Sequence, residues 1–133
     1  MTDRLAKELA MLKTHFPDIE FLEQDYGWFR IPRYAIPPGT WNSTECSVCF
    51  QVPAGYPGEP PYAFWTNPML RLAANGGPPV NNYQEPSPTP FCGTWGKFSW
   101  QHDKSWQPGA EPDSGTNLLD FAITFKDRLR EGA

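Results

Sequence analysis

FQVPAGYPGEPP, residues 50–61, is the stretch that decides the fold. It continues an apolar run and then places prolines at positions 53, 57, 60 and 61, with glycines at 55 and 58 between them. Proline fixes its own φ and biases the preceding residue toward extended backbone, so this stretch cannot continue a helix. It predicts an extended crossing that carries the chain from one strand to the next.

Strands are expected on both sides of this crossing. The run Glu45–Val52 alternates apolar and polar residues, which predicts a half-buried antiparallel strand. Cys46 falls on its apolar face and Cys49 on the opposite, polar face. Tyr62–Trp65 predicts the strand after the crossing.

A hairpin is expected before this pair. The apolar runs 19–22 and 28–34 flank the turn residues Asp25 and Gly27, a pattern typical of two connected strands. Pro32 cannot donate to a strand ladder, so it marks an edge or a bulge. Together the four segments predict a four-stranded antiparallel meander.

Helices are expected at both ends of the chain. Apolar residues recur at helical spacing between the possible cap Thr2 and Pro17. This pattern puts Glu8 on the exposed face. A second apolar stripe near the other end predicts a closing helix with a cap at Asp113, Ser114 or Thr116 and an end at Gly132. The two stripes consist of Leu5, Leu9, Leu12 and Phe16, and of Leu118, Ala122, Phe125 and Leu129.

No helix or strand pattern is sustained from residue 67 to residue 106. A loop of this length inside a compact domain is usually functional, so we expect any chemistry to lie here. Residues 75–90, rich in Gly, Pro and Asn, indicate a loop insertion rather than a domain boundary. We therefore predict a single domain over residues 1–133.

Charge and cysteine content make several classes of function and partner unfavourable for this chain. The chain has 11 basic and 15 acidic residues, so no basic stripe is available for nucleic acid. No run approaches the length of a membrane span, and the charged start differs from a signal peptide, so we expect a cytoplasmic protein without membrane contact. The 3 cysteines are an odd number, which favours reduced thiols. We expect no cofactor and no metal ion.

The order of these elements resembles the ubiquitin-conjugating-enzyme fold, an α+β fold in which a helix precedes a meander and a helix closes the chain. The most specific match is residues 50–61, where that family has a similar tyrosine-proline turn followed by a proline pair. Trp106-Gln107-Pro108 is similar to the tryptophan-x-proline after the family's catalytic segment. Asn67-Pro68, in place of the family's His-Pro-Asn, and residues 95–99 resemble bacterial members found in ubiquitin-like modification operons.

The resemblance implies transfer of a ubiquitin-like C-terminus, as a thioester, from an activating enzyme to an amine. Members of such operons work beside an activating enzyme, a ubiquitin-like protein and often a metal-dependent deconjugating peptidase. The reaction needs an accessible thiol and a group that stabilises the oxyanion. Cys92 lies in the irregular segment before the tryptophan-x-proline, where the family keeps its nucleophile. Cys92 is therefore the candidate carrier, although a plain loop cysteine is an equal alternative.

A second register aligns residues 96–99 with the family's glycine-x-aliphatic-cysteine and puts Ser99 at the nucleophile position. A hydroxyl exchanges thioesters only with a strong neighbouring base. His102 and Asp103 are near in sequence, but such groups meet through the fold rather than by proximity. His102 remains a candidate helper for the thiol mechanism. The alternative function is a catalytically inactive binding module, similar to RWD domains, that holds a ubiquitin-like protein or an activating enzyme.

Exposed rings and prolines in rigid loops make good protein anchors. On this basis Trp41-Asn42, Pro57–Pro61 and Tyr62–Trp65 are candidate partner contacts, with simple packing as the alternative. The remaining aromatic group is expected to pack under the long loop, and it consists of Trp95, Phe98, Trp100 and Trp106.

Overall fold

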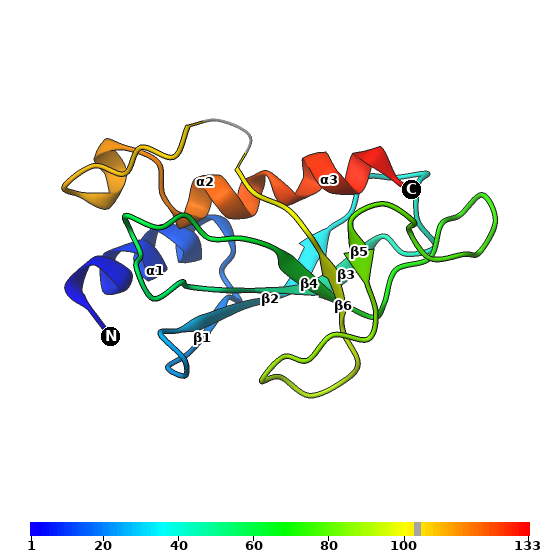
Figure 1. Ribbon diagram of the computed structural model, residues 1–133, viewed down its shortest axis with the longest axis horizontal. Helices are drawn as coiled ribbons and strands as arrows, with labels where there is room; N and C mark the ends of the chain where they lie inside the picture. The colour runs from blue at the N-terminus through cyan, green and yellow to red at the C-terminus, as the bar shows by residue number, and fades with distance from the viewer. Residues whose placement is uncertain (103–104) are drawn as a thin grey trace.

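Helix α1 (Asp3–His15) opens the chain in the computed structural model, which describes residues 1–102 and 105–133 (Figure 1). Thr2 caps the helix as predicted, since its hydroxyl accepts a hydrogen bond from the Leu5 amide at 3.1 Å. One expectation was wrong: Glu8 is buried, with only 1% of its surface exposed. Helical periodicity could not reveal this, because Tyr56 and Leu118, which also bind the Glu8 carboxylate, lie far away in the sequence.

The predicted meander is present. Strands β1 (Glu20–Leu22), β2 (Trp28–Ala35), β3 (Glu45–Gln51) and β4 (Phe64–Asn67) pair antiparallel in sequence order. The β2–β3 register shifts between Ile31 and Tyr34, which confirms a bulge at Pro32. The pairing of β1 with β2 covers only Trp28 to Arg30, so Pro32 lies beyond it, where that side of β2 has no strand partner among the described residues.

Two further strands extend the sheet inside the segment that showed no pattern. Strand β6 (Gly96–Phe98) pairs with β4, and β5 (Tyr83–Gln84) pairs with β6, which gives the order β1-β2-β3-β4-β6-β5. The expectation of no strand between residues 67 and 106 was therefore wrong. Strands of two and three residues are too short to show alternation; β6 is stabilised by pairing with β4, and β5 by pairing with β6. Residues 75–90, predicted as a loop insertion, supply the edge strand β5.

The closing helix is divided. A short 3₁₀ turn η1 (Pro112–Ser114) precedes α2 (Leu118–Ile123) and α3 (Phe125–Glu131), which Thr124 separates. The cap is Asn117 rather than the three residues predicted: its side chain accepts from the Asp120 amide, and the Asp120 carboxylate accepts from the Asn117 amide. Gly132, at φ 74°, follows the last helical residue as expected.

The sheet separates two apolar clusters. All the helices lie over one face, and the loop of residues 85–95 lies over the other (Figure 1). Alternate strand residues divide between the faces, so Val48 points to the helix side while Cys49 points to the loop side. The helix-side cluster is the larger; the loop-side cluster consists of Trp28, Cys49, Ala63, Trp65 and Trp95, with Leu22 and Phe91 packed against it.

Candidate functional site

Two of the three thiols are enclosed. Cys46 belongs to the helix-side cluster, as expected, and burial raises its pKa to about 12. Cys49 was expected on a half-exposed face, but loop 85–95 covers that face and the residue is fully buried. Burial also raises the pKa of the Cys49 thiol far above its usual range. Neither thiol has the access or the thiolate character that thioester exchange needs.

Cys92 is the exposed thiol. Its loop is anchored on both sides of the residue: Phe91 packs against Trp28, and the Trp95 indole donates to the Cys92 carbonyl at 3.1 Å. The Trp65 indole holds the start of the same loop by donating to the Ser87 hydroxyl at 2.9 Å. Cys92 therefore lies at the surface of a well-packed loop.

The end of β4 lies against this loop. The Asn67 side-chain amide donates to the Thr94 carbonyl at 2.9 Å. It also approaches Gly93 so closely that a Cβ there would lie 2.4 Å from the amide nitrogen. Gly93 has φ 104°, a conformation that side chains disfavour. Asn67-Pro68 thus lies next to the segment that carries Cys92, a neighbourhood that the sequence suggested only through the family's His-Pro-Asn.

Ser99 lies at the other end of β4. Its amide donates to the Asn82 carbonyl at 2.9 Å directly after β6, whose Phe98 pairs with Phe64. Ser99 therefore faces the start of β4, roughly 13 Å along the strand from Asn67 at the usual rise per residue. It borders a surface hollow of about 340 Å³ that Tyr62, Asn82, Trp100 and Gln101 also line.

His102 and Trp106 form a third group. Their ring centroids are 6.1 Å apart, and the Trp106 indole donates to the Pro57 carbonyl at 2.7 Å. Trp106 also packs against Tyr56, so the two motifs quoted from the sequence contact each other. Asp103, considered as an orienting group for His102, lies outside the described residues.

The structure does not bring the predicted site residues together. Cys92 belongs to the loop over one face of the sheet, whereas Trp106 packs against the helix-side cluster. His102 contacts Trp106 and so lies on the helix side, across the sheet from loop 85–95. Ser99 and His102 thus share an end of the molecule that Cys92 does not.

Some of the predicted partner contacts are buried and others are exposed. Trp41 is buried and donates to the Leu129 carbonyl at 2.8 Å, so the expectation that it is a free loop anchor was wrong. Trp65 is buried as well, whereas Tyr62 is 54% exposed. Within residues 1–102 and 105–133, no group of three or more His, Cys, Asp or Glu could hold a metal ion. No helix in this part of the chain is long and apolar enough to cross a bilayer.

One helix, a meander, a proline-rich crossing and closing helices define a protein of the ubiquitin-conjugating-enzyme (E2) class. Residues 7–118 match the model of prokaryotic E2 family E, and the chain belongs to that family. No curated protein and no solved structure matches the chain. Membership in an E2-like family indicates a role in ubiquitin-like conjugation, with protein partners.

Proposed function

We propose that this chain carries a ubiquitin-like protein as a thioester on Cys92 between an activating enzyme and an amine target. The observation that supports this is the exposure of the three thiols: Cys92 is open to solvent, whereas Cys46 and Cys49 are buried with raised pKa values. A carrier thiol must reach another protein's thioester, and in this chain only Cys92 can do so.

The chemistry is two acyl transfers. The Cys92 thiolate attacks the thioester carbonyl on the activating enzyme, a new sulfur–carbon bond forms, and the enzyme's thiolate leaves. An amine then attacks the Cys92 thioester, an amide forms, the Cys92 thiolate leaves, and the amine proton passes to solvent or a base. Each step passes through an oxyanion that needs a nearby donor.

Asn67 is proposed as a positioning residue for this thiol. Its amide donates to Thr94 and lies against Gly93, so it fixes the backbone that follows Cys92. Loss of this side chain should leave the thiol exposed while freeing its loop. The role of His102 as a helper to the Cys92 thiol stays a prediction, because the ring contact described for His102 is with Trp106.

The inactive binding module remains the second candidate. Ser99 favours it, because a hydroxyl follows β6 in the register that resembles the family's nucleophile, beside a hollow of about 340 Å³. In that case the chain would hold a ubiquitin-like protein or an activating enzyme without a covalent step.

The experiment that separates these functions uses a bacterial activating enzyme and its ubiquitin-like protein, with ATP. We expect an adduct that thiols cleave in the wild type and in Ser99→Ala, and none in Cys92→Ala. Asn67→Ala should form the adduct more slowly.

An adduct that persists in Cys92→Ala would refute the assignment of the carrier. Binding without an adduct in any variant would establish the inactive module instead. Cys46→Ala is the matched control, because it removes a thiol that the core encloses.

A further inference from the structure

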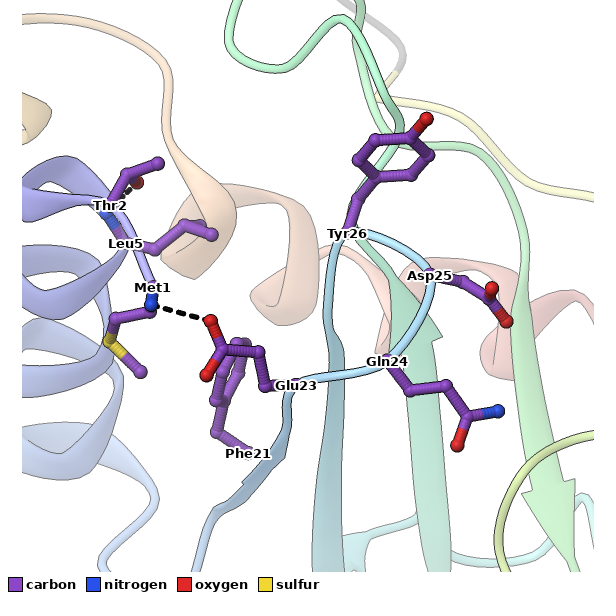
Figure 2. Close-up of a pocket in the computed structure, with 8 residues that line it drawn as sticks. All are labelled: Met1, Thr2, Leu5, Phe21, Glu23, Gln24, Asp25 and Tyr26. Carbon is purple, nitrogen blue, oxygen red and sulfur yellow. Dashed lines mark hydrogen bonds and ion pairs between the residues drawn. The ribbon is translucent and has the colours of Figure 1, made fainter.

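Tyr26 is held outward by an unusual turn between β1 and β2. Asp25 and Tyr26 both have positive φ, 48° and 72°, and the Gly27 amide closes the turn on the Gln24 carbonyl at 2.9 Å. Such positions favour Gly, Asn or Asp, so Asp25 suits its position whereas the larger Tyr26 side chain is strained. A tyrosine with 69% exposure instead occupies the tip (Figure 2). Strained backbone that persists without a packing reason often marks a binding site.

Three surface hollows meet at this side chain. The first, about 480 Å³, lies between the start of α1 and the β1–β2 turn (Figure 2). The second and third, about 230 and 350 Å³, run along the crossing at Val52, Pro53 and Ala54. The last of these reaches Tyr62, which is 54% exposed. The three hollows share Tyr26 as a lining residue and are here together termed the Tyr26–Tyr62 groove.

The charged rim of this groove is acidic. Glu23, Asp25 and Glu59 line its hollows and are exposed. Two cationic groups lie nearby: the Met1 amine contacts Glu23 at 2.5 Å, and the Arg4 guanidinium donates to Glu8 and to the Gly109 carbonyl. The Met1 amine thus compensates Glu23, and Arg4 is directed to Glu8 and Gly109, so Asp25 and Glu59 are the rim carboxylates without a cationic partner in the described part of the chain.

We propose that the Tyr26–Tyr62 groove binds an extended, basic segment of a protein partner. Two exposed tyrosines and a proline-lined floor suit the backbone and apolar side chains of an extended peptide. The unpaired rim carboxylates Asp25 and Glu59 suit lysine or arginine, and the Tyr26 ring offers a face for cation–π contact. This inference concerns a surface that excludes Cys92, so it stands whether or not that thiol reacts.

The test is a titration of the ¹⁵N-labelled protein with a synthetic lysine-, leucine- and glycine-containing peptide, followed by NMR. A peptide with glutamate in place of each lysine is the charge control. We expect saturable shifts at residues 23–27 and 52–62 with the lysine peptide only, weakening as salt is added. Equal binding of the glutamate peptide, shifts confined to other surfaces, or no saturable shift would overturn the proposal.

Variants separate the ring from the charges. Tyr26→Asn removes the ring while suiting the positive φ, so the turn is kept, and affinity should fall. The double change Asp25→Asn and Glu59→Gln should weaken binding roughly two- to fivefold per charge, the range of exposed ion pairs. Glu45→Gln, an exposed carboxylate outside the groove, should leave affinity unchanged. Unchanged affinity in Tyr26→Asn and in the double variant would also overturn the proposal.

Discussion

The Tyr56 hydroxyl donates to the Glu8 carboxylate at 2.6 Å and so ties the proline-rich crossing to helix α1. The other carboxylate oxygen accepts from the Leu118 amide at 2.7 Å, at the start of α2. Arg4 donates to the same side chain at 3.0 Å. One buried carboxylate therefore joins the first helix, the crossing and the closing helices, and an acidic group at a helix start is favourable.

Replacement of Glu8 by Ala should be strongly destabilising. The change leaves the Tyr56 hydroxyl, the Leu118 amide and the Arg4 guanidinium without this acceptor. We expect a loss of about 3–5 kcal/mol in the free energy of unfolding, measured by urea denaturation. Glu111→Ala, which removes an exposed partner of Lys7, is the control and should change stability little. Similar losses in both variants would contradict this assignment.

Thiol labelling should count one reactive cysteine in the native protein. Cys92 is exposed, whereas burial protects Cys46 and Cys49 and raises both pKa values. With a chromogenic disulfide reagent near neutral pH, we expect one rapid equivalent, and three after unfolding in denaturant. Native Cys92→Ser should show no rapid equivalent. Rapid labelling of a second thiol in the native wild type would mean that loop 85–95 opens easily.

Gly93→Ala should loosen the Cys92 loop. The added Cβ would meet the Asn67 amide at 2.4 Å, and φ 104° is strained for alanine. Gly39→Ala is the matched control, because it has φ 88° and nothing within 4 Å of a Cβ. We expect Gly39→Ala to cost about 1–2 kcal/mol from backbone strain alone and Gly93→Ala to cost more. Urea denaturation with the alkylation rate of Cys92 measures both effects, and equal costs would argue against the Asn67 contact.

The Arg71–Glu85 pair should make the folding stability depend on pH in the acid range. Hydrogen bonds from Arg71, at 2.7 and 2.9 Å, hold the Glu85 pKa below its usual 4.5. A carboxyl with a lowered folded pKa contributes stability above its unfolded pKa and loses it as the pH falls through the folded value. Glu85→Gln should therefore be less stable than the wild type at pH 7 but lose less stability below about pH 4.5.

Thermal denaturation between neutral and acid pH measures this difference. Glu45→Gln, at an exposed carboxyl, is the control and should follow the wild-type profile. Parallel profiles for Glu85→Gln and the wild type would show that the Arg71 contact does not persist in solution.

Local sequence was sufficient for most of the framework. Thr2 and Pro17 bound the first helix, residues 45–52 alternate as a strand, and the prolines of residues 50–61 force an extended crossing. These features follow from backbone restriction and from side-chain periodicity over short windows. The contact between Trp106 and Pro57 then shows why the two quoted motifs belong to one fold.

Tertiary structure decided what local pattern could not. Helical spacing put Glu8 on the surface, but Tyr56 and Leu118 approach it from distant parts of the chain and enclose it. Cys49 looked half-exposed until loop 85–95 covered its face, because alternation reports one face of a sheet and not what lies over the other. The positions of Cys92 and Ser99 at opposite ends of β4 likewise follow from the pairing of β6 with β4. A strand of three residues becomes stable only through that pairing, so periodicity in the sequence could not predict it.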